Sequence, residues 1–339
     1  MSTRLSIFEG LPDGLLQHDA RALAGRLGGP SLIHLPGHRE PPLVVSVLLH
    51  GNETSGWEGL RRLLRERGTL PRSLIVFIGN VDAAAAGVRT LAHQQDFNRI
   101  WRGAAGPEGS LAAQVLQTLS ARELFAAVDL HNNTGRNPHY AVLTHLTRDN
   151  LGLAYLFSDK AVHVREPDTV MTRALARRCP AVALELGPIG DARCEERAFD
   201  FLNRCLGLGK IPPADETRLQ MFRTEARVHV AAGVPFSFAG QERNHPLVLT
   251  GGLEGVNFHE LAPGTEFAVT SGGLEGLRVR DVLHREVTGD YFELRDGRVL
   301  LRRAVIPAMY TTDAVVIRQD CLCYFMKRLA RPESSDSQH

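Results

Sequence analysis

The sequence predicts an α/β fold, in which a largely parallel sheet is covered by helices on both faces and is followed by a smaller, mostly β domain. Strand and helix signals alternate through the first two thirds of the chain, as they do in sheets built from crossover connections. After Gly207, short β-type runs alternate with glycine, proline and aspartate turns instead. At 339 residues, 43% of them hydrophobic, the chain is long enough to bury the cores of two domains.

The elements of the first domain follow from hydrophobic periodicity. Continuous apolar runs predict buried strands at 43–49, 74–78, 125–130, 140–146 and 181–186. A helix is expected between the first two strands, because apolar residues recur at helical spacing at Trp57, Leu60, Leu63 and Leu64. We expect Ser110 to cap a second helix over 111–124, and a third helix to run from about 191 to 206.

The change from alternating strand and helix signals to short β-type runs predicts the domain boundaries. We expect a catalytic domain over 1–212, a β-rich domain over 213–331 and a flexible tail over 332–339, with a proline-containing linker at 210–215. The runs at 227–230 and 298–301 are typical of strands in the second domain. The string Gly-Gly-Leu-Glu-Gly occurs at 251–255 and again at 272–276, but five residues are too few to indicate a repeat architecture.

Composition excludes several classes of function. A formal net charge of +1 provides no basic field for nucleic acid, so small or peptide-like substrates are the expected partners. No stretch approaches the roughly 20 apolar residues of a membrane span, and the first residues lack an apolar signal core. The five cysteines are odd in number and lack paired metal-site spacing, which favours reduced thiols. We therefore expect a cytoplasmic enzyme that binds neither nucleic acid nor membrane, and a homo-oligomer is compatible with the sequence.

Two strand ends carry residues that can hold a metal ion. His50 and Glu53 follow the run 43–49, and His131 follows the run 125–130. Each of these residues alone would more often be an ordinary polar side chain, but open parallel sheets place their sites beyond the carboxyl ends of strands. A catalytic zinc ion takes three protein ligands, commonly imidazole and carboxylate, and keeps a fourth position open. The pattern favours a zinc site.

Further polar residues suit hydrolysis at such a site. Glu185 ends an apolar strand, where partial burial would raise its pKa toward a range useful for proton transfer; without a metal site, a capping or salt-bridged glutamate is an equal reading. Asn98 and Arg99 offer an amide and a guanidinium fork for a carboxylate. Arg89 could polarise a scissile carbonyl. Alone, either arginine would more often be a surface charge.

Seven motifs together resemble the succinylglutamate desuccinylase/aspartoacylase family of zinc carboxypeptidase-like hydrolases. In chain order they are His50-Gly51-Asn52-Glu53, Asn80 with Arg89 nine residues later, Asp96-Phe97-Asn98-Arg99, Asp129-Leu130-His131-Asn132, Leu184-Glu185-Leu186-Gly187-Pro188, Asn257-Phe258-His259-Glu260-Leu261-Ala262-Pro263-Gly264 and Ile306-Pro307-Ala308-Met309-Tyr310. The resemblance extends from about 43 to 316. It implies a three-layer α/β/α catalytic domain with a mostly parallel or mixed sheet and a C-terminal β domain that narrows the active-site entrance.

The resemblance also implies roles for individual residues. It assigns one zinc ion per chain to His50, Glu53 and His131, and it makes Glu185 the general base and later the proton donor. Arg89 matches the carbonyl-polarising arginine. The residues implied to contact substrate are Asn98, Arg99, Tyr310 and Arg173, with Arg177 or Arg178 as alternatives to Arg173. His93, His139, His145 and His163 lie outside this set, and a structural or solvated role is expected for them.

The implied activity is hydrolysis of the amide bond in a small, carboxylate-bearing N-acyl amino acid, by a zinc-activated water with Glu185 as the base. Two residues more than in aspartoacylase separate Arg89 from Asn98, so the acyl group and amino acid stay open. A zinc carboxypeptidase or peptidoglycan-peptide amidase is one alternative. A non-catalytic zinc-binding protein of the same fold is another, although Glu185 and Arg89 argue against it.

Overall fold

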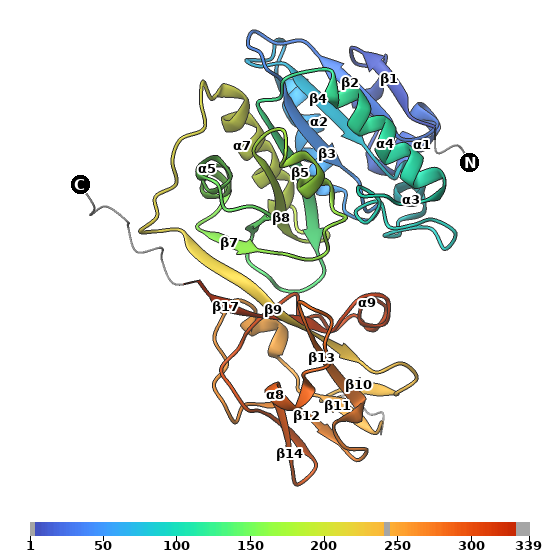
Figure 1. The fold of residues 1–339 in the computed structure, drawn as a ribbon. Coiled ribbons are helices and arrows are strands. Elements are labelled where there is room, and N and C mark those ends of the chain that lie inside the picture. Colours follow the sequence, from blue (N-terminus) through green and yellow to red (C-terminus); the bar gives the residue numbers. More distant parts are fainter. Residues whose placement is uncertain (1–3, 241–244, 330–339) are drawn as a thin grey trace, which may run out of the picture. The chain divides into compact units, whose positions relative to one another are not determined.

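A computed structural model describes residues 4–240 and 245–329, and it resolves two compact units (Figure 1). The first unit comprises Met1–Asn132 and His139–Gln220. The second comprises Met221–His339 together with a short segment, Asn133–Pro138, that leaves the first unit and returns to it. The predicted tail at 332–339 lies outside the described residues.

The first unit contains a mixed sheet with the strand order β1-β2-β4-β3-β5-β8-β6-β7. Its strands are β1 Ser6–Glu9, β2 Ser31–Leu35, β3 Leu43–Val47, β4 Leu74–Ile78, β5 Ala126–Asn133, β6 Tyr140–Leu143, β7 Lys160–His163 and β8 Ala181–Pro188. Strand β3 pairs in parallel with both β4 and β5, whereas β2 is antiparallel to β4 and β6 is antiparallel to β8. The predicted α/β class and mixed sheet are confirmed.

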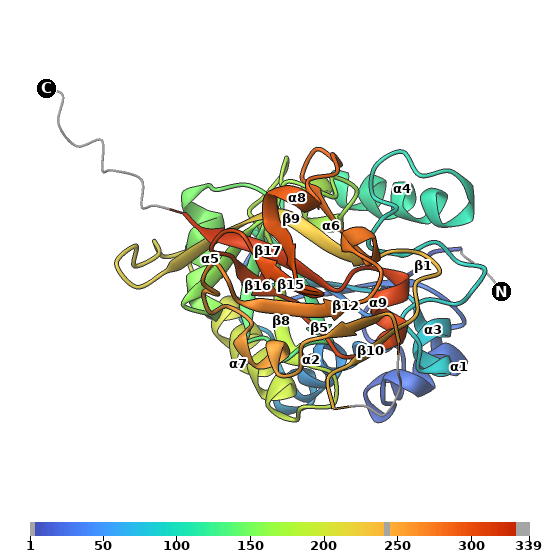
Figure 2. The same cartoon turned by 90° about the horizontal axis from the view of Figure 1, so that it is seen from below.

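Helices cover both faces of this sheet. The 3-10 and α-helices are η1 Leu15–Gln17, η2 Ala20–Ala22, α1 Leu23–Leu27, α2 Ser55–Glu66, α3 Val81–Ala86, α4 Gly106–Ser120, α5 Arg148–Phe157, α6 Met171–Leu175 and α7 Arg193–Gly207. Figure 2 shows α4 on one side of the strands and α2 with α7 on the other. The apolar face of α4 packs with α6 against side chains of β3, β4 and β5 in one buried cluster. The result is a three-layer α/β/α unit.

The bounds of several predicted elements differ from those observed; the strand expected at 140–146, for example, spans only Tyr140–Leu143. The first strand ends at Val47 rather than at 49, because Leu48 has a φ of 58° and turns the chain. The helix expected over 111–124 spans Gly106–Ser120, with Pro107 in its first turn, where a missing N–H costs nothing. Ser110 does not cap this helix; its hydroxyl donates to the Gly106 carbonyl from within the first turn.

The second unit is built mainly of β strands, as the sequence predicts. They are β9 Gln220–Val230, β10 Phe236–Phe238, β11 Leu247–Leu249, β12 Glu266–Thr270, β13 Leu277–Asp281, β14 Phe292–Arg295, β15 Arg298–Leu301, β16 Ile306–Ala308 and β17 Cys323–Arg328. Strand β9 is antiparallel to β13 and to β17, and β17 is antiparallel to β16. The strands β10-β11-β12-β15-β14 form a separate sheet in that order.

Aromatic side chains fill the core of the second unit, where Phe267, Phe292 and Phe325 pack edge to face or tilted against one another. Phe267 also packs edge to face against Tyr310, and Phe325 stacks on Tyr291. Short helical elements connect the strands: η3 Leu253–Val256, η4 Leu274–Gly276, α8 Thr288–Tyr291 and α9 Ala314–Gln319. Both copies of the Gly-Gly-Leu-Glu-Gly string form a 3-10 turn that begins at the leucine. Within 4–240 and 245–329, no helix combines the length and apolarity needed to cross a bilayer.

Candidate metal centre and catalytic site

The loop after β3 brings His50 and Glu53 to one side of a tight turn. Leu48 adopts a left-handed backbone conformation, and the Glu53 amide donates to the His50 carbonyl at 3.1 Å. Gly51 lies against helix α3, so that a Cβ at this position would meet the carbonyl carbon of Ala83 at 2.2 Å. Only glycine fits there, and the close packing fixes the direction in which the turn presents its two side chains.

His131 meets the same carboxylate from strand β5. His50 Nδ1 lies 2.8 Å from Glu53 Oε1, and His131 Nδ1 lies 2.7 Å from Glu53 Oε2. One ligand atom from each of these three buried residues lies within 4.8 Å of the others. Among the described residues, this is the one group of three or more such side chains that could hold a metal ion. Residues 78 positions apart thus converge as the sequence predicts.

The outer nitrogens of both imidazoles face further carboxylates. His50 Nε2 lies 3.0 Å from Asp96 Oδ1, and His131 Nε2 lies 2.7 Å from Asp129 Oδ2. A neutral imidazole has one N–H, so it can donate to only one of its two carboxylate neighbours. Each ring therefore needs either an extra proton or a cation near its Nδ1 atom.

A divalent cation fits this requirement. With the N–H on Nε2 donated to Asp96 or Asp129, each Nδ1 lone pair is free to bind metal, and Glu53 supplies an oxygen. Carboxylates that orient the outer nitrogen of a ligating histidine are typical of zinc sites. Two nitrogen donors and one oxygen donor suit zinc in particular.

The charges around the site also favour a bound cation. Burial acts to raise the pKa of Glu53, but the two histidines outweigh it and hold this pKa well below its usual range. Burial acts to lower the pKa of His131, but Asp129 and Glu53 outweigh it and raise this pKa well above the usual value. The carboxylates therefore favour a positive charge at this position, which either a proton or a metal ion can provide.

Glu185 lies near the carboxyl end of β8, next to the strand that carries His131. Its Oε2 atom is buried and makes no hydrogen bond. Burial is the main reason that its pKa is raised to about 7, partly offset by the positive charges of His131, His50 and Arg89. A carboxyl group that ionises near neutral pH and has an oxygen without a hydrogen-bond partner suits proton transfer.

Arg89 and Asn98 lie beside the metal ligands. The Arg89 guanidinium donates to Asp96 Oδ2 at 2.9 Å and lies 3.5 Å from Glu53 Oε1. Asn98 Nδ2 is 3.3 Å from His131 Nε2. The half-buried Arg99 guanidinium donates to the carbonyl of Asn98 at 2.9 Å. All three lie on the loop between α3 and α4, whose position Asp96 fixes by accepting the Asn98 amide at 2.7 Å.

The contacts of Arg173 and Tyr310 differ from those of Arg89 and Asn98, which lie beside the metal ligands. Arg173, on α6, donates to the carbonyls of Val164 and Arg165, and neither of these residues is a proposed metal ligand. Tyr310 belongs to the second unit, where its ring packs edge-on against Phe267 and its hydroxyl donates to a main-chain carbonyl at 3.4 Å. These are the contacts of a core residue, and a substrate role for either side chain stays a prediction.

Sequence reasoning assigned no role to three residues that the structure places in the site, namely Asp96, Asp129 and Asn132. Each stands inside a motif that had been singled out for a neighbour. The only signal in the sequence was a carboxylate or amide one or two positions from a proposed site residue, and it does not say which partner the side chain meets.

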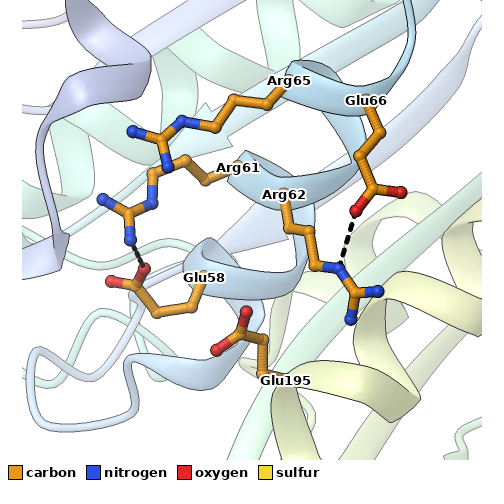
Figure 3. Close-up of a pocket in the computed structure, with 6 residues that line it drawn as sticks. All are labelled: Glu58, Arg61, Arg62, Arg65, Glu66 and Glu195. Atoms are coloured by element: carbon orange, nitrogen blue, oxygen red, sulfur yellow. Dashed lines mark hydrogen bonds and ion pairs between the residues drawn. The ribbon is translucent and has the colours of Figure 1, made fainter.

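A pocket of about 260 Å³ elsewhere on the first unit contains none of these residues (Figure 3). It is lined by Glu58, Arg61, Arg62, Arg65, Glu66 and Glu195. Arg61 pairs with Glu58, and Arg62 pairs with Glu66 at 2.9 Å. Its acidic and basic side chains largely neutralise one another, so this is a feature of the surface between α2 and α7.

The fold and the site define a three-layer α/β/α unit with a buried His-Glu-His cluster. Residues 40–205 match the sequence model of the Succinylglutamate desuccinylase/Aspartoacylase catalytic domain. The predicted resemblance to this family is therefore confirmed over these residues. No curated protein sequence matches the chain.

Solved structures of the same fold cover most of the chain. Succinylglutamate desuccinylase from Vibrio cholerae is 17% identical, with 90% of this chain and 87% of that chain covered and a TM-score of 0.58. The ectoine utilization protein EutE (DoeB) from Ruegeria pomeroyi is 16% identical over 88% and 84%, with a TM-score of 0.53. Murine aminoacylase 3 is 18% identical over 86% and 97%, with a TM-score of 0.50. At these identities the likeness establishes the fold.

Proposed function

We propose that the protein is a zinc-dependent deacylase that hydrolyses the amide bond of a small N-acyl amino acid bearing a carboxylate. One observation carries the proposal: a buried cluster of His50, Glu53 and His131 lies near a glutamate, Glu185, that has a free oxygen and a pKa of about 7. The names of the structural relatives, a desuccinylase and an aminoacylase, support the same substrate class.

His50, Glu53 and His131 would hold one zinc ion per chain. Zinc at such a site acts as a Lewis acid and lowers the pKa of water toward about 7. Glu185 takes a proton from the attacking water on its unpartnered Oε2 atom, because this oxygen has no competing donor. The protonated Glu185 then donates the proton to the nitrogen of the leaving amine.

Arginine side chains orient the substrate in this mechanism. The guanidinium of Arg89 donates to the carbonyl oxygen as negative charge develops there, while Asp96 holds the guanidinium in place. Asn98 and Arg99 grip the substrate carboxylate, since a guanidinium fork matches two carboxylate oxygens. The fixed loop between α3 and α4 thus sets the distance between the carboxylate and the scissile bond.

The proposal is tested with purified full-length protein and a panel of acetyl-, succinyl- and formyl-amino acids, with short peptides for comparison. We expect hydrolysis of at least one N-acyl amino acid, loss of activity with a chelator, and recovery on addition of Zn²⁺. Glu185→Gln should lose turnover by several orders of magnitude and retain bound zinc. Cleavage of peptides alone would show that the protein is a peptidase rather than a deacylase. Protein that binds zinc but hydrolyses nothing on the panel would overturn the proposal.

A further inference from the structure

Asn132, the residue after His131, bonds to the two segments that carry Glu53 and Glu185. Its main-chain N–H donates to Glu53 Oε2 at 3.2 Å. Its side-chain Oδ1 accepts from the Ser55 amide at 3.3 Å, and its Nδ2 donates to the Gly187 carbonyl at 3.1 Å. The residue is 4% exposed, so water does not substitute for these bonds.

The orientation of the Asn132 amide is fixed by its partners. A main-chain N–H such as that of Ser55 can only donate, and a carbonyl such as that of Gly187 can only accept. The oxygen of Asn132 must therefore face α2 and its nitrogen must face β8. An asparagine meets both demands at once, whereas aspartate lacks the donor and serine lacks the length.

Asn132 and the two partners of its side-chain amide lie one or two residues from the proposed catalytic groups. Ser55 begins helix α2 two residues after Glu53, Gly187 lies two residues after Glu185, and Asn132 itself follows His131. Building on the proposed function, we propose that Asn132 is a positioning residue that fixes the metal ligands and Glu185 relative to one another. Sites of this kind tolerate displacements of only about 0.5 Å.

Apart from the main-chain pairing of β8 with β5, the side-chain bonds to the end of β8 lead to a different element. The carbonyl of Leu186 accepts from Arg197 at 2.7 Å and from the Cys194 thiol at 3.2 Å. Both donors belong to α7, so these bonds fasten the strand to the helix that covers it. The amide of Asn132 connects the same stretch of β8 to the strand that carries His131.

Asn150, in helix α5, provides a matched control that bonds to the other end of strand β8. This asparagine is 2% exposed, its Nδ2 donates to the His145 carbonyl at 2.9 Å, and its Oδ1 accepts from the Ala181 amide at 2.9 Å. It thus joins two segments to β8 as Asn132 does, but at Ala181, the first residue of the strand. Loss of either side chain removes one donor and one acceptor from the buried interior.

The experiment compares Asn132→Ala with Asn150→Ala in the full chain. Stability is measured by denaturant unfolding, Zn²⁺ affinity by chelator competition with the metal-free protein, and kcat and KM with the best substrate of the panel. We expect similar losses of stability. Asn132→Ala should weaken zinc binding at least 10-fold and lower kcat at least 100-fold with KM changed less than 3-fold, while Asn150→Ala changes each less than 3-fold.

Asn132→Asp separates the bond to the Ser55 amide from the bond to the Gly187 carbonyl. It also replaces the alanine variant in the experiment if that variant does not fold. Aspartate still accepts from the Ser55 amide but cannot donate to the Gly187 carbonyl, so kcat should fall at least 10-fold without weaker zinc binding. Wild-type kcat in this variant, or equal effects of Asn132→Ala and Asn150→Ala, would overturn the inference. Wild-type protein that binds zinc without hydrolysing any amide overturns only the proposed function, because the zinc affinities still decide the role of Asn132.

Discussion

His50 and Asp96 are 46 residues apart in the chain, and their side chains meet at 3.0 Å between Nε2 and Oδ1. The second oxygen of Asp96 accepts from Arg89 at 2.9 Å. One carboxylate thus orients a proposed metal ligand and a proposed substrate arginine together. Burial acts to raise the pKa of Asp96, but His50, Arg89 and Arg99 outweigh it and keep the group ionised.

Replacing Asp96 by asparagine should weaken zinc binding. The neutral amide is a poorer acceptor for the His50 N–H, and such outer partners typically contribute 10- to 100-fold to metal affinity. We expect the zinc dissociation constant to rise by roughly 10- to 100-fold, measured by chelator competition. Asp168→Asn is the control, because Asp168 also pairs with an arginine, Arg102, and does not belong to the His50-Glu53-His131 cluster. An unchanged dissociation constant in Asp96→Asn would count against the metal site.

The raised pKa of Glu185 should make the stability of the metal-free protein depend on pH. The pKa rises from 4.5 to about 7 on folding because the group is buried. Between these values the folded protein holds a proton that the unfolded chain releases, so this contribution is complete below pH 4.5 and is lost as the pH rises through about 7. The full loss corresponds to roughly 3 kcal/mol.

The measurement is the free energy of unfolding of wild type and Glu185→Gln from pH 5 to 8, with a chelator present. Glutamine cannot ionise, so the wild type should lose stability relative to the variant as the pH rises. A difference that stays constant over this range would show that Glu185 ionises at an ordinary pKa.

Removing the guanidinium of Arg99 should impair substrate binding and leave the metal site intact. Arg99→Met keeps the length of the side chain but cannot pair with a carboxylate, so KM should rise at least 10-fold, on the order of 1.4 kcal/mol. Zinc content should be unchanged. Arg102→Met, three residues on and paired with Asp168, should leave KM within 3-fold of wild type. Equal KM values for the two variants would remove Arg99 from the substrate site.

Gly51→Ala should disrupt the turn that presents His50 and Glu53. The added Cβ would come within 2.2 Å of the main chain of helix α3, which cannot move without unpacking. We expect a loss of stability of about 1–3 kcal/mol together with weaker zinc binding. Gly68→Ala is the matched control, since no atom lies within 4 Å of a Cβ at that position. Thermal unfolding and zinc titration of both variants would reveal whether the turn tolerates a methyl group.

Tyr310→Phe tests whether this tyrosine acts in the core or on the substrate. Its buried hydroxyl donates to the carbonyl of Thr250, so its loss should cost about 1 kcal/mol of stability. From these contacts we expect KM and kcat to stay within 2-fold of wild type. A KM raised 10-fold at unchanged stability would instead support the substrate role implied by the family resemblance.

The metal ligands could be predicted from the sequence because their signal is local. His50 and Glu53 stand three residues apart directly after an apolar strand, and His131 occupies a second strand of the same kind. The carboxyl ends of adjacent parallel strands meet at one edge of a sheet, so the convergence follows from the fold class. Glu185 was predictable for the same reason.

The partners of these ligands could not be predicted, because tertiary folding alone decides which carboxylate meets which ring. Asp96 lies on a long loop whose path no periodicity describes, and it reaches His50 across 46 residues. The start of α4 was missed because Gly106 and Pro107, usually signs of a turn, open the helix. For Tyr310, a strand sequence cannot distinguish a core side chain from one that faces a pocket.

The short excursion Asn133–Pro138 limits how the protein can be divided. Within the second unit, Asn137 accepts the Met309 amide at 2.8 Å, and a side chain at Gly135 would meet the Tyr310 carbonyl at 2.4 Å. The second unit is therefore not a simple C-terminal module. A chimaera joined only at Gln220 would combine the segment 133–138 of one relative with the β unit of another. Exchange of this unit between relatives therefore requires a second exchanged segment, which begins immediately after Asn132.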